Sequence, residues 1–178
     1  AGKITPMNSN EKLLLRRQLS ASRPQPSAGL TERLVALVTQ HAAKTVASYW
    51  PLPSEPDVTE FNRWAAENLN LVLPRVSGRD LKFAAGELRE GAFGIAEPQG
   101  TAVPVAEIDL MIVPALAADM AGNRLGKGRG FYDRVLSNYS GKRIAVIFDS
   151  ELLDSVPSEP HDQRVQIIVT PLRTVVVG

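Results

Sequence analysis

The 178-residue chain contains 20 Lys and Arg against 19 Asp and Glu, so its formal net charge of +1 at pH 7 excludes a strong overall attraction to polyanions. Its 44% hydrophobic and 22% charged residues are typical of a globular domain and exclude extensive disorder. The absence of cysteine excludes disulfides, thiolate zinc sites and a thiol nucleophile, and it favours a cytoplasmic location.

The chain starts with a polar stretch, which we predict to be a flexible leader over residues 1–8 before a single α/β domain over residues 9–178. Apolar residues then recur at helical spacing until Pro24 and predict a first helix. This helix also contains Lys12 and Arg16, so the domain is expected to begin with a positively charged element.

Two helices and three strands are predicted next. Leucines at helical spacing indicate a helix over 28–43 with one side facing a core. Residues 45–50 are mostly β-branched and aromatic and are closed by prolines, which indicates a buried strand that ends in a loop. A helix over about 58–68 and strands over 69–76 and 81–86 follow.

The second half of the chain continues this alternation. Glycines and prolines through residues 91–100 predict a loop. Residues 108–116 form a continuous apolar run, which is typical of a central strand covered on both faces. The remaining predicted elements are a helix over 131–141 and strands over 143–149, 166–170 and 174–177. The pattern predicts a layered α/β domain with a mostly parallel sheet and ligands at the carboxyl ends of its strands.

A glycine-rich basic stretch, GNRLGKGRGFYDR at residues 122–134, follows the central strand. Glycine tolerates positive φ and has no side chain, so successive main-chain N–H groups of a GxGxG loop can turn inward around an anion. The surrounding cations are Arg124, Lys127, Arg129 and Arg134. Because the pattern is neither a P-loop nor a GxGxxG fingerprint, phosphate binding and a solvated basic connection stand as alternatives.

Acidic and aromatic residues near this loop each have two interpretations. Asp133 suits Mg²⁺ held against nucleotide phosphates, or it is a first-turn acid that complements the helix dipole. Tyr132 suits stacking on a ring or donation to a phosphate, whereas one of Phe131 and Tyr132 is expected to anchor the helix in the core. Asp162 is a better metal-ligand candidate than its neighbour His161, because adjacent positions rarely chelate one ion.

A longer segment, DLMIVPALAADMAGNRLGKGRGFYDRVL, resembles the pattern of the 5-formyltetrahydrofolate cyclo-ligase family, in which a hydrophobic strand ending in VP leads to RLGxGxGxYDR. Other landmarks occur in the family's order: KxxLR from Lys12 to Arg16, then PLPSEPDVT, LPRV, GAFGIAEP, and PHD followed by IIVT. The resemblance therefore covers nearly the whole chain.

This resemblance implies an enzyme with a single catalytic three-layer α/β/α domain, of the kind shared with sugar-phosphate isomerases and CoA transferases. It implies that ATP, with Mg²⁺ as cofactor, drives cyclisation of 5-formyltetrahydrofolate to 5,10-methenyltetrahydrofolate. The implied steps are phosphorylation of the formyl oxygen, attack by N10, and release of ADP and phosphate.

The family's site positions transfer to this sequence residue by residue. Positions that contact ATP correspond to Lys12, Arg16, Arg124, Leu125, Gly126, Lys127, Gly128, Arg129, Gly130, Phe131 and Tyr132. Positions that contact folate correspond to Trp50, Glu55, Lys127, Gly128, Arg129, Gly130 and Phe131, and magnesium positions correspond to Asp133 and Asp162. Within the loop, Lys127, Arg129 and Tyr132 are expected to act in catalysis.

Three positions, Ala115, Ala118 and Glu151, depart from the family pattern and are expected in the wall of the site. Two alternatives to the family's activity are a phosphosugar isomerase-like or other phosphate-binding enzyme of the same architecture and a non-catalytic RNA-binding module. A net charge of +1 with only 6% aromatic residues disfavours the RNA-binding module. No apolar run approaches the roughly 20 residues of a membrane span, so we expect no membrane partner. The expected partners are the small molecules 5-formyltetrahydrofolate and Mg-ATP, with no nucleic acid, and we expect a monomer.

Overall fold

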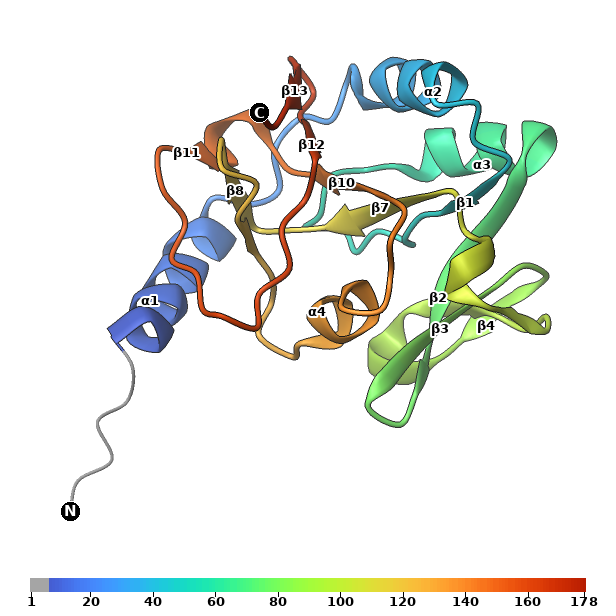
Figure 1. Ribbon diagram of the computed structural model, residues 1–178, viewed down its shortest axis with the longest axis horizontal. Helices are drawn as coiled ribbons and strands as arrows, with labels where there is room; N and C mark the ends of the chain where they lie inside the picture. The colour runs from blue at the N-terminus through green and yellow to red at the C-terminus, as the bar shows by residue number, and fades with distance from the viewer. Residues whose placement is uncertain (1–6) are drawn as a thin grey trace.

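An eight-stranded sheet forms the centre of the computed structural model, which describes residues 7–178 with side chains from Ser9 onward (Figure 1). In spatial order its strands are β13 Thr174–Val176, β12 Ile167–Val169, β10 Lys142–Val146, β7 Leu110–Pro114, β1 Thr45–Ala47, β2 Asn70–Ser77, β3 Asp80–Ala84 and β6 Ala102–Val103. The five strands from β12 to β2 are parallel, and antiparallel pairings add β13 at one edge and β3 and β6 at the other. The predicted mostly parallel sheet is confirmed.

Helices cover both faces of the sheet, because alternate residues of each strand point to opposite sides. The covering helices are α2 Leu30–Gln40 and α3 Thr59–Asn68 on one face and α4 Phe131–Leu136 on the other (Figure 1). Leu110 and Ile112 of β7 pack on the α2 and α3 side, whereas Met111 and Val113 pack on the α4 side. All four side chains are 0% exposed, so the predicted central strand and the three layers of a single α/β domain are confirmed.

Helix α1 (Met7–Ala21) packs against a small second sheet that continues from β7. This sheet contains β8 Ala117–Asp119, β9 Arg124–Leu125 and β11 Leu152–Leu153. Leu15 and Leu19 of α1 pack against a buried cluster that includes Leu125, which places the basic helix beside the start of the glycine loop. The helix begins before the predicted boundary at residue 9, and residues 1–6 of the predicted leader lie outside the described residues. Within residues 7–178, no helix is both long and apolar enough to cross a bilayer.

The predicted loop at 91–100 is wrong in part, because it contains a strand. Strand β5 (Ala96–Pro98) pairs with β4 (Leu88–Glu90) around a 3-10 turn at Ala92–Gly94. The Glu97 carboxylate accepts a hydrogen bond from the Val76 N–H at 2.6 Å and so ties this hairpin to β2. Glycine and proline spacing does not reveal such a long-range contact.

Several predicted elements end earlier than expected, among them one strand and one helix that lead into or away from the cleft. The strand predicted over 45–50 ends at Ala47, which leaves Tyr49 and Trp50 beyond the sheet. The helix predicted over 131–141 ends at Leu136, and beyond this end the Arg143 guanidinium donates to the carbonyls of Leu136 and Tyr139 at 2.7 and 2.6 Å. These bonds satisfy carbonyl groups that have no partner within the helix at its C-terminal end.

A buried ion pair attaches the chain after α1 to the domain. Arg23 Nε lies 2.7 Å from Glu151 Oε2, and the two side chains are only 2% and 1% exposed. The guanidinium also donates to the Ala115 carbonyl at 2.6 Å, and Glu151 accepts from the Phe148 N–H at 2.9 Å. Because its hydrogen-bonding groups are paired, this arrangement tolerates two charges in the protein interior.

Replacing one partner of this pair is expected to destabilise the domain strongly. Arg23→Ala leaves Glu151 buried and uncompensated, so we expect the free energy of unfolding in urea to fall by about 3–5 kcal/mol. The control is Arg173→Ala, which removes the exposed Arg173–Asp149 pair, with side chains 52% and 33% exposed. Its expected loss is below about 1 kcal/mol. Equal losses in the two variants would contradict this account.

Candidate active site

A cleft of about 510 Å³ lies where β1 and β7 end, with Tyr49, Trp50 and Pro114 in its wall. All residues predicted to bind ATP, folate or Mg²⁺ line this one cleft: Lys12, Arg16, Trp50, Glu55, Asp162, and every residue from Arg124 to Asp133. The structure thus brings together positions from the first helix, two loops and the chain before β12. Their individual roles stay predictions.

The glycine loop runs along the cleft from β9 to α4. Gly128 and Gly130 have φ values of 101° and 72°, a backbone conformation that residues with a Cβ rarely adopt. The Arg16 Nε donates to the Gly126 carbonyl at 2.8 Å and so fixes the loop to α1. Helix α1 therefore positions the loop in addition to placing its cations in the cleft.

Two loop cations contact the opposite wall. Lys127 Nζ lies 2.7 Å from Glu55 Oε1, and the Arg129 guanidinium lies 3.9 Å from the Phe93 ring centroid. The Glu55 side chain is 7% exposed, and its second oxygen accepts from the Leu52 N–H at 2.8 Å. Glu55 is thus a fixed buried acceptor, while Lys127, 44% exposed, is the more accessible partner of the pair.

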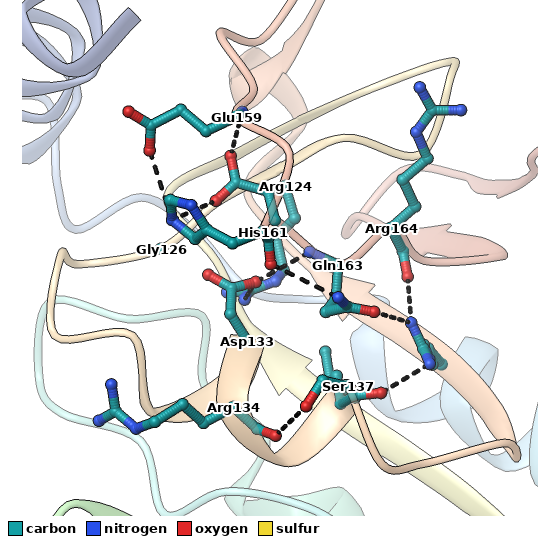
Figure 2. A network of polar contacts seen from close by, with 12 residues as sticks. Arg124, Gly126, Asp133, Arg134, Ser137, Glu159, His161, Gln163 and Arg164 are labelled. Atoms are coloured by element: carbon teal, nitrogen blue, oxygen red, sulfur yellow. Dashed lines mark hydrogen bonds and ion pairs between the residues drawn. The ribbon is translucent and has the colours of Figure 1, made fainter. Parts of the chain in front are cut away.

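Asp133 joins the glycine loop to the chain that precedes β12 (Figure 2). Its Oδ1 lies 3.2 Å from the Arg124 guanidinium and accepts from the Gln163 N–H at 3.0 Å. The Arg124 side chain is 3% exposed and also donates to the Pro114 carbonyl at 3.3 Å. Among the described residues its Nε has no partner, so this guanidinium retains an unused donor. Asp133 therefore links α4 to β9 and to the chain that precedes β12.

Lys12 lies between two carboxylates of the loop that contains Asp162. Its Nζ is 2.5 Å from Asp162 Oδ2 and 2.9 Å from Glu159 Oε2. Ser9 Oγ donates to the other Glu159 oxygen at 2.5 Å. The Ser9 hydrogen bond, followed by that from Lys12, lowers the pKa of Glu159 below its ordinary value. His161 is exposed, with its Nε2 3.4 Å from both carboxyl groups.

The aromatic residues that follow the glycines divide between core and cleft. Tyr132 lines the cleft and also packs on the core beneath α4. Burial, and after it the Glu55 carboxylate, raises the pKa of the Tyr132 hydroxyl, and Arg124 offsets part of this rise. The hydroxyl therefore stays protonated at neutral pH. Phe131 lies toward Phe93, with 6.3 Å between ring centroids. Tyr132 is therefore the core anchor of the two and also lines the cleft, while its role toward a ligand stays a prediction.

The sequence interpretation did not assign several residues of the cleft. Glu159 and Ser9 were missed because only the packing of α1 against the 159–162 loop brings them together. The apolar wall was also missed, although it contains landmarks of the quoted motifs: Pro74 and Val76 from LPRV, and Phe93 and Ile95 from GAFGIAEP.

The three departures from the family pattern lie in different places. Ala115 lines the cleft as expected, but placing Ala118 and Glu151 in its wall is wrong. Ala118 is fully buried in β8, paired with Leu152 of β11, and Glu151 binds Arg23. Both belong to the support beneath the site.

Comparison with known proteins gives one consistent family. The model of the 5-formyltetrahydrofolate cyclo-ligase family matches residues 9–171. A 5-formyltetrahydrofolate cyclo-ligase of Mycolicibacterium smegmatis is 37% identical over 150 residues, covering 76% of this chain and 77% of that protein. One of Haemophilus influenzae with the same name is 28% identical over 169 residues, covering 86% of each.

Solved structures support the same relationship. The NMR structure of Aquifex aeolicus 5,10-methenyltetrahydrofolate synthetase superposes with a TM-score of 0.81 at 28% identity, covering 93% of this chain and 92% of that one. A 5,10-methenyltetrahydrofolate synthetase from Mycoplasma pneumoniae has a TM-score of 0.74 at 23% identity, covering 90% and 99%, and supports the fold.

The contact between Ser9 and Glu159 predicts a measurable shift in titration. In Ser9→Ala, the pKa of Glu159 is expected to rise toward its ordinary value, because its largest stabilising hydrogen bond is lost. Carboxyl-carbon NMR across acidic pH measures this. In wild type, the contact stabilises the folded protein at pH values above the ordinary glutamate pKa. This stabilisation is lost as the pH falls through the lowered pKa of Glu159 in the folded protein. Ser20→Ala, at an exposed position of the same helix, should leave the titration unchanged. An unshifted Glu159 in Ser9→Ala would refute the contact.

Proposed function

The chain belongs to the 5-formyltetrahydrofolate cyclo-ligase family, and from this premise we propose that its cleft cyclises 5-formyltetrahydrofolate to 5,10-methenyltetrahydrofolate with conversion of ATP to ADP and phosphate. The observation that supports the proposal most is that residues matching the family's nucleotide, folate and magnesium positions line a single cleft. In that arrangement the two substrates would meet without a large domain movement.

The chemistry explains why a nucleotide is needed. The formyl group on N5 is an amide, whose oxygen is a poor leaving group, so N10 cannot displace it directly. Attack of the formyl oxygen on the γ-phosphoryl group forms a carbon–oxygen–phosphorus link and releases ADP. N10 then bonds to the activated carbon, loses its proton, and expels the former formyl oxygen as phosphate. This sequence requires no nucleophile from the protein.

Positioning and charge are the main contributions that a protein makes to phosphoryl transfer. We propose that main-chain N–H groups of residues 126–130 surround the phosphates, with Lys127 and Arg129 beside the transferred group. Tyr132, whose hydroxyl is held protonated, would act as a neutral hydrogen-bond donor there. Holding N10 beside the activated carbon makes ring closure intramolecular, which can contribute up to about 7–11 kcal/mol.

The carboxylates of the cleft fit a hard divalent cation. Asp133 and Asp162 line the same cleft, and each already binds a cationic group, Arg124 and Lys12 respectively. Carboxylates together with phosphate oxygens are the usual ligands of Mg²⁺. We therefore propose that these two residues hold Mg²⁺, which when bound neutralises charge on the transferred phosphoryl group. Arg124 and Lys12 would then be released toward phosphate oxygens.

The folate end of the cleft is proposed at Glu55 and Trp50. A buried, ionised carboxylate can accept paired hydrogen bonds from the amide and amino groups of a pterin. Glu55 has this environment, and apolar side chains such as Val76 and Leu81 line the rest of the wall. Lys127 holds Glu55 at 2.7 Å, so binding of both substrates requires this pair to separate.

Other expectations accompany this proposal. We propose a cytoplasmic monomer, supported by the cysteine-free composition and the compact cleft within one chain. No observation on residues 7–178 favours the isomerase-like or RNA-binding alternatives, and family membership disfavours both.

The activity and its metal dependence are tested optically. Protein with ATP, Mg²⁺ and 5-formyltetrahydrofolate should generate the conjugated methenyl chromophore, and omission of ATP should abolish it. Asp133→Asn is expected to lower kcat/KM for Mg-ATP by about 10²–10³-fold, because it removes a charge that holds the metal and orients Arg124. Asp154→Asn, at an exposed loop position, is the control. Unchanged kinetics in Asp133→Asn would refute the metal assignment.

The folate assignment is tested by binding. Glu55→Gln should raise the Kd for 5-formyltetrahydrofolate by about 10- to 100-fold, because a charge-assisted hydrogen bond is lost. The same change frees Lys127, so the Kd for a non-hydrolysable ATP analogue should stay equal or become tighter. Calorimetric titration measures both values, with the exposed Glu60→Gln as control. Loss of nucleotide affinity with intact folate binding would reverse the assignment.

A further inference from the structure

Glu159 lines the cleft and has no role in the proposed reaction, although its carboxylate makes some of the shortest contacts there. Glu159 Oε1 accepts from Ser9 at 2.5 Å, and Glu159 Oε2 accepts from Lys12 at 2.9 Å. Both oxygens therefore bind side chains of α1. Its main-chain N–H also donates to Asp162 Oδ2 at 2.8 Å, so Glu159 contacts both partners of the Lys12–Asp162 pair.

Glu159 and Asp162 differ in how many of their carboxylate oxygens bind side chains of α1. Asp162 Oδ2 binds Lys12 and the Glu159 N–H, whereas its Oδ1 lies 3.4 Å from the Nε2 of the exposed His161. Glu159 has both of its oxygens engaged by α1. Asp162 is thus the carboxylate that can exchange a ligand, and Glu159 is the one that holds α1.

Lys12 is buried, so it needs a carboxylate partner even when Asp162 binds another group. The Lys12 side chain is 7% exposed, and a buried ammonium group needs a charged partner. Among residues 9–178, Glu159 and Asp162 are its two ion-pair partners. If Asp162 turns to a divalent cation, Glu159 remains to neutralise Lys12 and keep it in the cleft.

We infer that Glu159 is a positioning residue that acts through Lys12. It retains the ammonium group when Asp162 binds the metal, and so lowers the competition between Lys12 and the metal for Asp162. This role rests on the proposed function, because it requires a metal at Asp162 and a nucleotide beside Lys12. Without the Glu159 charge, Lys12 would depend on Asp162 alone and would oppose metal binding.

The primary test is Glu159→Gln, which keeps the side-chain size and one acceptor oxygen but removes the charge. Calorimetry with a non-hydrolysable ATP analogue at varied Mg²⁺ gives the half-saturating Mg²⁺ concentration, which is expected to rise about 10-fold. In steady-state assays, KM for Mg-ATP should rise while kcat stays within about twofold. Glu11→Gln is the matched control, because it removes the same charge from an exposed position of α1.

A double-mutant cycle separates action through Lys12 from direct binding. In a Lys12→Met background, Glu159→Gln should change the half-saturating Mg²⁺ concentration less than twofold, because its intermediary is absent. Equal effects in both backgrounds would overturn the inference and indicate that Glu159 binds the metal itself. An unchanged Mg²⁺ requirement in the single variant, with only a lower melting temperature, would overturn it in favour of a purely structural role.

A milder variant serves if Glu159→Gln does not fold. Ser9→Ala leaves the charge in place but loosens Glu159, so the half-saturating Mg²⁺ concentration is expected to rise about two- to threefold, and no rise would overturn the inference. Failure of the wild type to form the methenyl chromophore would instead refute the proposed function. Wild-type turnover with a Glu159→Gln variant indistinguishable from it would refute only the role of Glu159.

Discussion

Pairing of opposite charges between distant segments is the interaction on which this cleft depends. Lys12 binds Asp162, Arg124 binds Asp133, and Lys127 binds Glu55. Each cation matches a predicted nucleotide position, and each carboxylate matches a predicted metal or folate position. The charged groups of the site thus neutralise one another in pairs. This arrangement lowers the cost of placing so many charged groups around one cleft.

The sheet makes this pairing available by bringing chain segments to one edge. Parallel strands end on the same side, so the loops after β1 and β7 meet there. Helix α1 closes the site from outside, with Arg16 on the glycine loop and Lys12 on the 159–162 loop. Beneath the site, the buried Arg23–Glu151 pair fixes the chain that follows α1. The support is therefore rigid, while Lys127 and Arg129 remain exposed.

An exchange of ionic partners connects this structure to the proposed reaction. Binding of Mg-ATP would give the carboxylates a metal and the cations phosphate oxygens, and folate would replace Lys127 on Glu55. Because each ligand must displace an internal partner, binding of one ligand releases groups that another ligand needs. Such sharing predicts coupling between sites, with equal effects of each ligand on the other. The cleft would therefore favour the complete set of substrates.

Local patterns in the sequence determined the alternation of strands and helices, the buried central strand and the glycine loop, because each depends on neighbouring residues. The motif resemblance also indicated which residues share one site, from Lys12 to Asp162. Tertiary structure alone decided how these residues are paired, and it alone revealed Glu159 as a partner of Ser9 and Lys12. It also decided the hairpin at Ala96–Pro98, where Glu97 accepts from Val76, and the early end of α4, where the Leu136 carbonyl accepts from Arg143. Such contacts join residues far apart in the chain, and their geometry exists only once the layers have packed.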